Sequence, residues 1–304
     1  MSVSILLASY NGEAYIEQQI QSIFEQSFQD WSLTISDDGS TDRTIELVEP
    51  LKGKSPNTIT LKDGPKQGFV SNFLSLACSS ELNTDYYAFC DQDDIWLPGK
   101  LQRAVDWLKS VPDESPALYC SRTRLINENG QACGLSPLFP RPPSFQNALV
   151  QSIAGGNSMV FNRAARELLQ LGGANAEVPS HDWWSYLLVT SFGGQVFYDT
   201  EPSLLYRQHD NNEVGANRSL WARALRVQML LQGRFYQYSE ANFAALEPLK
   251  ERMDEEHSSL LEQFKVVHSA PLMKRLRSFL QGGFYRQTPG ENLMLAVAVL
   301  LNKI

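Results

Sequence analysis

The chain has 304 residues, of which 43% are hydrophobic, so it can bury a sizeable core and does not have the composition of a disordered protein. Its formal charge of −8 is unevenly spread: residues 1–214 carry 14 basic and 26 acidic side chains, whereas residues 215–304 carry 12 and 8. Because nucleic-acid binding needs a basic face, the acidic first part is a poor binder, and we expect no nucleic-acid partner.

Three features indicate the compartment. The four cysteines show no paired metal-ligand spacing, which is typical of reduced thiols in a cytoplasm. Met1-Ser2-Val3 leads directly into an apolar segment, so we expect no signal peptide. The longest apolar run, 293–301, is shorter than the ~20 residues that span a bilayer. We therefore predict a cytoplasmic protein.

The first part of the chain alternates short apolar segments with segments of helical spacing. Strands are predicted at 3–8, 31–36, 58–61 and 86–90, and helices at 13–27, up to about 48, at 68–78 and at 98–111. This alternation predicts an α/β fold with a doubly wound, mostly parallel sheet.

The pattern after residue 111 is less regular. Strands are predicted at 118–125, 155–161 and 195–199, a hairpin turn at 127–130, and helices at 163–171, from 180 onward, at 220–238 and at 243–267. We divide the chain into residues 1–214, with halves 1–98 and 99–214, and a helical, basic extension of residues 215–304.

The sequence is organised around Asp91-Gln92-Asp93-Asp94, which directly follows the buried strand at 86–90. Three carboxylates this close repel one another, and a divalent cation removes that repulsion. Oxygen ligands at the end of a buried strand suit Mg²⁺ or Mn²⁺. The alternative is a polar turn that caps the next helix, but one aspartate would be enough for a cap. We therefore prefer a metal site.

Polar clusters follow three of the predicted strands: Ser9-Tyr10-Asn11, Asp37-Asp38-Gly39 and Asp91-Gln92-Asp93. Parallel sheets bind ligands at the carboxyl ends of their strands, so we expect these clusters to form one site. The sequence contains neither a Walker A motif nor a GxGxxG motif, so ordinary NTPase and NAD interpretations lose support. Gly155-Gly156 would let the backbone approach a ligand closely, although a bulge is the alternative.

The end of the chain has a different character. Residues 265–304 contain six Lys or Arg side chains and one acid, with apolar residues between them. This pattern suits a helix on an anionic membrane surface. It suits equally well a helical appendage that packs on the first part of the chain, or on a second subunit in a homodimer.

Three motifs, Ala8-Ser9-Tyr10-Asn11-Gly12, residues 36–42 and residues 91–98, resemble the family 2 glycosyltransferases of the GT-A fold. Residues 180–184 and 206–212 resemble, more narrowly, bacterial enzymes that add rhamnose to cell-surface polysaccharides from dTDP-rhamnose. The resemblance covers about residues 1–215. It implies a nucleotide-binding half, an acceptor half, and inverting, metal-dependent transfer. The implied partners are a dTDP- or UDP-linked sugar donor and a glycan or lipid-linked glycan acceptor, handled in the cytoplasm or at the inner face of the cell membrane.

The resemblance also implies roles for individual residues. Asp38 would accept the N3–H of the donor's pyrimidine base, and Asp182 would be the general base. Asp93 would ligate the metal, Asp91 would face the ribose or a metal-bound water, and His209 matches a late histidine that often completes the metal site. The further donor-side candidates are Ser9, Tyr10, Asn11, Gly39, Gln92 and Arg207, and the acceptor-side candidates are Gly156, Asn157, His181, Trp183 and Trp184.

The chemistry of sugar transfer requires the same two groups, a metal site and a separate carboxylate. Sugar transfer builds negative charge on a leaving diphosphate, which a divalent cation neutralises, and the attacking hydroxyl must lose a proton to a separate carboxylate. Asp182 at a helix start supplies such a carboxylate; the alternative is a simple N-cap. Three other functions stay open: the same enzyme class with a UDP-hexose donor, a non-catalytic sugar-binding module, and a nucleotidyltransferase. The last ranks low, because no basic residue follows the first strand.

Overall fold

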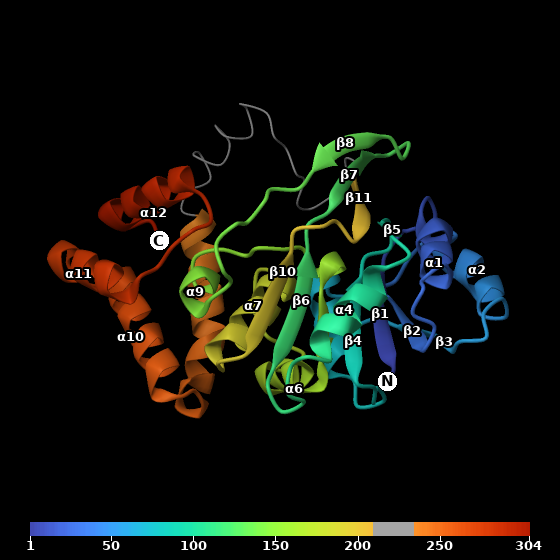
Figure 1. Ribbon diagram of the computed structural model, residues 1–304, viewed down its shortest axis with the longest axis horizontal. Coiled ribbons are helices and arrows are strands. Elements are labelled where there is room, and N and C mark those ends of the chain that lie inside the picture. Colours follow the sequence, from blue (N-terminus) through green and yellow to red (C-terminus); the bar gives the residue numbers. More distant parts are fainter. Residues whose placement is uncertain (209–233) are drawn as a thin grey trace.

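The computed structural model describes residues 1–208 and 234–304. A seven-stranded sheet lies at its centre (Figure 1). In spatial order its strands are β10 (Gln195–Asp199), β6 (Ala117–Ser121), β9 (Val160–Asn162), β4 (Tyr86–Cys90), β1 (Val3–Ser9), β2 (Trp31–Asp37) and β3 (Ile59–Asp63). Strand β9 runs antiparallel to β4 and β6, and the other neighbouring pairs are parallel. The predicted doubly wound, mostly parallel sheet is confirmed.

Helices cover both faces of this sheet (Figure 1). They are α1 (Ile16–Phe24), α2 (Thr44–Val48), α3 (Phe69–Cys78), α4 (Lys100–Leu108), the short α5 (Phe145–Ala148), α6 (Arg163–Gly172) and α7 (His181–Ser191). Strand β1 is apolar apart from Ser4 and Ser9 because both of its faces are covered: Leu6 lies in the core beneath α3, α6 and α7, whereas Ile5 and Leu7 lie in the core beneath α1 and α4.

A second sheet of four strands lies beside the carboxyl end of β4. Its strands in order are β5 (Ile95–Trp96), β11 (Leu204–Gln208), β7 (Arg124–Asn127) and β8 (Ala132–Leu135). The single strand predicted at 118–125 is therefore wrong, because the chain leaves the first sheet after β6 and enters the second at β7. Arg122 and Thr123 make the transition and bond to Ser136. The turn predicted at 127–130 is confirmed: Gly130 N–H donates to Asn127 O at 2.9 Å.

Two further boundaries differ from the prediction. Residues 155–161 are not one strand, because the short 3₁₀ helix η2 (Gly156–Ser158) precedes β9. Helix α4 begins at Lys100 rather than Pro98, because β5 ends at Trp96 and a turn at Pro98 and Gly99 precedes the helix.

The described part of the C-terminal region is helical. It comprises α9 (Arg234–Leu246), η3 (Glu247–Arg252), α10 (Glu255–Ser269), α11 (Leu272–Gly282) and α12 (Pro289–Leu301). The single helix predicted at 243–267 is wrong. Pro248 sits in the 3₁₀ segment η3, and α10 then starts anew at Asp254, whose carboxylate accepts from His257 N–H at 2.8 Å.

These helices share a core with the main sheet. Leu261, Phe264 and Val299 are buried in the same hydrophobic cluster as Trp184 of α7. The main chain of Arg141 and the side chain of Gln287 exchange two hydrogen bonds, of 2.8 and 3.1 Å. The boundary proposed at residue 214 lies outside the described residues and stays a prediction.

Two general expectations about the chain can be compared with the structure. All four cysteines are free, as predicted. Within residues 1–208 and 234–304, no helix is both long and apolar enough to cross a membrane.

Candidate active site

The three predicted polar clusters meet at one edge of the main sheet. Ser9 and Asp37 are paired in register at the ends of β1 and β2, and the Ser9 hydroxyl donates to Asp37 at 2.9 Å. The side-chain amide of Gln92 both donates to and accepts from the main chain of Tyr10, each at 2.9 Å. The convergence expected from strand ends is therefore present, and Gln92 holds the loop after β4 against the loop after β1.

The two neighbouring aspartates after β2 have different surroundings. Asp37 is buried, and its Oδ1 accepts from the N–H groups of Gly39 and Ser40 at 3.1 and 2.8 Å. Gly39 has a φ of +97°, which this turn requires. Asp38 accepts from the N–H groups of Lys66 and Gly68 at 2.6 and 2.7 Å. Its carboxylate thus lies against the loop before α3, and base recognition by Asp38 stays a prediction.

The loop after β1 is joined to the loop after β2 by main-chain contacts. Asn11 adopts a left-handed φ of +47°, and its side-chain oxygen accepts from Thr41 N–H at 2.9 Å. Gly12 donates to Thr44 Oγ1 at 2.7 Å, and a side chain at Gly12 would overlap Gln92. These contacts give Asn11 a structural role beside the donor contact that we expected.

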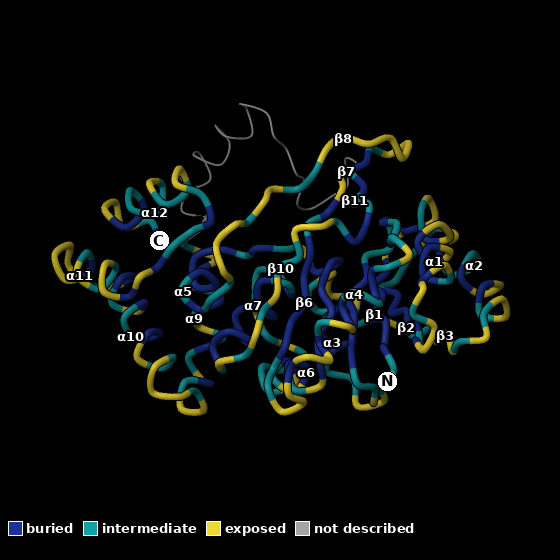
Figure 2. Tube along the Cα trace, in the orientation of Figure 1, coloured by how far each residue is buried: buried dark blue, intermediate teal, exposed yellow. Residues whose placement is uncertain are grey.

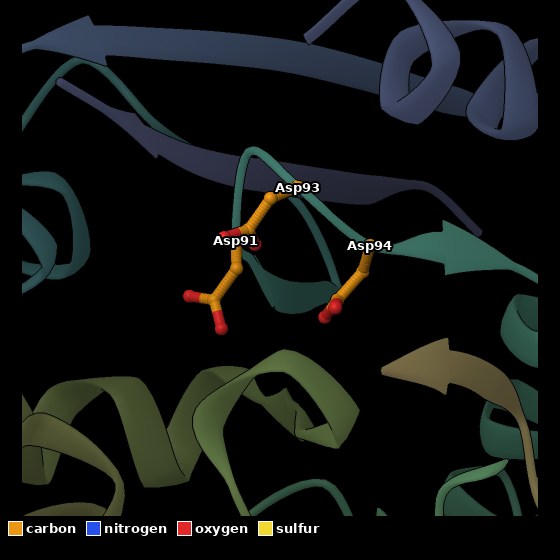
Figure 3. A group of neighbouring side chains, drawn as sticks. All are labelled: Asp91, Asp93 and Asp94. Carbon is orange, nitrogen blue, oxygen red and sulfur yellow. The ribbon is translucent and has the colours of Figure 1, made fainter. Parts of the chain in front are cut away.

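Asp91, Asp93 and Asp94, hereafter the acid loop, are the group of described residues that could hold a metal ion. One carboxylate oxygen from each lies within 4.8 Å of the other two. Figure 3 shows the carboxylates of Asp91 and Asp94 directed toward the same side of the loop. The pKa of Asp91 is raised to about 8, mainly by burial and further by the negative charges of Asp93 and Asp182, against an opposing effect of Lys100. Such a cluster fits a hard divalent cation.

Asp94 anchors the acid loop. Its side chain is completely buried, and its two oxygens accept from Asn157 Nδ2 at 2.5 Å and from the main-chain N–H of Arg207 at 3.1 Å. Burial and the charges of Asp93 and Asp91 raise the pKa of this carboxyl. Asp94 therefore holds the acid loop between the 3₁₀ helix η2, which contains Asn157, and strand β11, which contains Arg207. The sequence did not reveal this role.

Arg207 braces the acid loop from within the protein. Its side chain is buried, and its guanidinium donates to Asp93 O at 2.9 Å and to Gln18 Oε1 at 2.7 Å. The same group lies 4.4 Å from the ring centre of Tyr15. These partners are groups of the protein itself, and the donor contact expected of Arg207 stays a prediction.

Lys100 lies beneath the acid loop and was not predicted. It is completely buried, its Nζ donates to Asn157 O at 2.8 Å, and it lies 4.5 Å from the Trp96 ring centre. Burial lowers the pKa of Lys100 to about 7, against the opposing charges of Cys90, Asp94 and Asp91. A lysine on the apolar face of a helix, in step with Ala104 and Leu108, is the sequence signal that could have indicated this burial.

Asp182 lies in the first turn of α7. Its Oδ1 accepts from Ser180 Oγ at 2.5 Å and from Trp183 N–H at 2.6 Å. Its negative charge contributes to the raised pKa of Asp91, so these two carboxylates lie close enough to interact. Residues 91 positions apart in the chain thus act on each other across one site.

The residues next to Asp182 pack inward. The imidazole of His181 lies 4.0 Å from the Phe73 ring and 4.8 Å from the Phe89 ring, and burial lowers its pKa to about 4. Neither of its ring nitrogens has a hydrogen-bond partner among the described residues. Trp184 is completely buried, so, in contrast to our expectation, it offers no surface to an acceptor; Trp183 is 8% exposed, with Nε1 donating to Ala148 O. His209 lies outside the described residues.

Replacing Gly156 with Ala should damage this site. A Cβ at position 156 would overlap His181 Nε2 and lie 3.0 Å from Cδ2 and Cε1, and the imidazole is enclosed by aromatic rings. We expect a loss of about 1–3 kcal/mol in the free energy of unfolding, measured by denaturant titration. Gly290→Ala is the matched control, because no atom lies within 4 Å of its added Cβ; equal losses in both variants would contradict the packing argument.

The raised pKa of Asp91 predicts how stability depends on pH. The group favours the folded state below its usual pKa of 3.8 and loses that contribution as pH rises toward about 8. Without metal, the melting temperature of wild type should therefore fall from about pH 4 to pH 8 relative to that of Asp91→Asn. Added Mg²⁺ or Mn²⁺ should raise it more at pH 8 than at pH 5, since the ligand must be deprotonated. Identical pH profiles for wild type and variant would refute this assignment.

A mostly parallel sheet with an acidic loop at the carboxyl ends of its strands is typical of the GT-A glycosyltransferases, and comparison with known proteins agrees. Residues 4–168 match the family "Glycosyl transferase family 2", so the chain belongs to that family of glycosyltransferases. Within it, the acidic cluster with Asp91-Gln92-Asp93 fits a DxD motif, in agreement with the metal site expected there.

The chain is similar to several individual proteins. The chain is 31% identical to the dTDP-rhamnosyl transferase RfbG of Shigella flexneri over 243 residues. The alignment covers 76% of this chain and 80% of the relative. In structure it is similar to S. aureus TarS 1–349 in complex with UDP-GlcNAc, with a TM-score of 0.61, 15% identity, and coverage of 100% and 79%. It is also similar to the mannosyltransferase PcManGT from Pyrobaculum calidifontis with GDP-Man and Mn²⁺, with a TM-score of 0.53, 18% identity, and coverage of 98% and 79%. The two structural likenesses establish the GT-A fold.

Proposed function

We propose that the protein is an inverting, metal-dependent glycosyltransferase that moves rhamnose from dTDP-rhamnose to a hydroxyl group of a bacterial surface glycan. The observation that supports the mechanism is the electrostatic interaction between Asp182 and Asp91, which indicates that a separate carboxylate lies within interaction range of the carboxylate cluster. The similarity to RfbG over most of both chains supports the sugar. The acceptor would be a glycan or a lipid-linked glycan at the inner face of the cell membrane.

The residues would divide the work as follows. Asp91 and Asp93 would hold Mg²⁺ or Mn²⁺, which when bound neutralises negative charge on the leaving diphosphate. Asp38 and the main chain near Ser9 and Tyr10 would bind the nucleotide. Asp182 would take the proton of the attacking hydroxyl, and inverting transfer would require that this happen on the face of the sugar opposite the leaving diphosphate.

The buried residues behind the site would preserve its geometry. Asp94, Arg207 and Asn157 connect the acid loop to β11 and η2 through hydrogen bonds between 2.5 and 3.1 Å. A carboxylate cluster repels itself, so without such anchors the loop would spread apart. Pre-organisation of this kind reduces the rearrangement that donor binding requires.

A panel of nucleotide sugars tests the donor. In the presence of Mg²⁺ we expect dTDP-rhamnose at about 100 times its Kd to stabilise the protein by about 2.7 kcal/mol, seen as a raised melting temperature. A larger shift with a UDP-hexose would replace rhamnose by that sugar within the same enzyme class. Donor binding without transfer to any glycan acceptor would favour a sugar-binding module, and no shift with any donor would count against the whole proposal.

A further inference from the structure

The outward face of α12 is apolar, and no segment within residues 1–208 or 234–304 covers it. Leu293, Leu300 and Leu301 are 67%, 50% and 54% exposed. Their spacing of seven and eight residues places them on one side of the helix. The opposite side of α12, with Leu295, Ala298 and Val299, is buried in the core. The helix is therefore well packed on one side and presents a row of large apolar side chains on the other.

Helix α11 also has an exposed face with large apolar side chains, and this face carries basic groups as well. Met273 and Leu280 are each 78% exposed, and Lys274 and Arg277 are exposed between them. Residues 273, 277 and 280 follow helical spacing, so they share one face. Neither Lys274 nor Arg277 forms an ion pair or a side-chain hydrogen bond with any described residue. As far as the described part of the chain goes, both cations are available to an anionic partner.

The two helices form one rigid support. Arg275 is 7% exposed, and its guanidinium donates to Leu300 O at 3.2 Å and to Asn302 Oδ1, which ties α11 to the end of α12. Figure 2 shows the exposed parts of both helices at one end of the molecule. The outward faces of α11 and α12 are hereafter the terminal surface.

The positive charge of residues 270–304 favours an anionic partner. Residues 270–304 carry five basic side chains and one acid, Glu291, whose carboxylate is occupied in the capping box with Thr288. Residues 1–214 carry 26 acids against 14 bases, so an anionic partner would be repelled there and attracted here. Large apolar side chains among unpaired cations are the composition of helices that lie in the headgroup region of a bilayer.

We propose that the terminal surface docks the protein onto an anionic lipid bilayer. Leu293, Leu300, Leu301, Met273 and Leu280 would enter the headgroup region, and Lys274 and Arg277 would contact lipid phosphates. Docking of this kind goes beyond the transfer reaction, and it would bring the protein to the membrane on which lipid-linked acceptors are carried.

Flotation of the full-length protein with vesicles tests the proposal. We expect it to bind phosphatidylcholine vesicles containing about one-third phosphatidylglycerol at least ~10-fold more tightly than pure phosphatidylcholine, with binding weakened by salt. Leu293→Gln/Leu300→Gln and Lys274→Glu/Arg277→Glu should each weaken it about 10-fold or more. Lys54→Glu/Lys109→Glu is the matched control, because it makes the same charge change at exposed positions outside the terminal surface.

Melting temperatures would confirm that the variants fold, which their exposed positions favour. Equal binding by wild type and both variants, or no binding of wild type to anionic vesicles, would overturn the proposal. So would a lipid-free dimer, seen by sedimentation velocity, that Leu293→Gln/Leu300→Gln dissociates, since a second copy would then cover the face. Vesicle binding needs neither donor nor acceptor, so its failure is distinct from failure of the proposed glycosyl transfer.

Discussion

Asp182→Asn is expected to reduce the rate of sugar transfer by about 10²–10⁴-fold, because the attacking hydroxyl would lose its general base. Donor binding should persist, since the substitution leaves the acid loop intact. The fold should persist too, because the asparagine oxygen can still accept from Ser180 and Trp183. Transfer rates and donor-induced shifts in melting temperature measure the two effects separately.

A second readout of this variant tests the geometry without any turnover. The charge of Asp182 helps to raise the pKa of Asp91, so its removal should lower that pKa. Metal-dependent stabilisation should then begin at a lower pH than in wild type. Glu177→Gln, an exposed position with the same charge change, should alter neither property. If Asp182→Asn transferred sugar as fast as Glu177→Gln, the general-base assignment would be abandoned.

Substitutions at Asp93 and Asp94 should both have large effects, but on different properties: Asp93 on metal binding and transfer, and Asp94 on stability without metal. Asp93→Asn is expected to abolish stabilisation by Mg²⁺ or Mn²⁺ and to lower transfer about 10³-fold, or ~4 kcal/mol in activation free energy, because a metal ligand is lost. Its stability without metal should not fall, since the charge of Asp93 raises the pKa of both Asp91 and Asp94 and its removal relieves that repulsion.

Asp94→Ala is the matched comparison one residue further along. It removes a completely buried carboxylate and leaves Asn157 Nδ2 and the N–H of Arg207 without their acceptor. We expect a loss of about 1–3 kcal/mol in stability without metal, measured by denaturant titration. Equal stability of the two variants would show that the two aspartates are not divided into one ligand and one anchor.

Local pattern in the sequence determined the architecture. Apolar runs followed by helical spacing predicted the parallel strands β1, β2 and β4, because burial on both faces of a sheet requires such runs. The ends of those strands then placed Ser9, Asp37 and the acid loop at one edge, since parallel strands end together. The glycosyltransferase family was also readable, because its motifs are short and contiguous.

Tertiary structure alone decided which of the polar and aromatic site candidates are buried. Arg207 braces the acid loop, and Lys100 and Trp184 are completely buried, because each is enclosed by segments distant in the chain. The hydrogen bonds that anchor Asp94 join it to residues 63 and 113 positions away. A local sequence pattern records periodicity over one element, whereas burial and pairing depend on which elements meet, so these roles emerge only when the chain is folded.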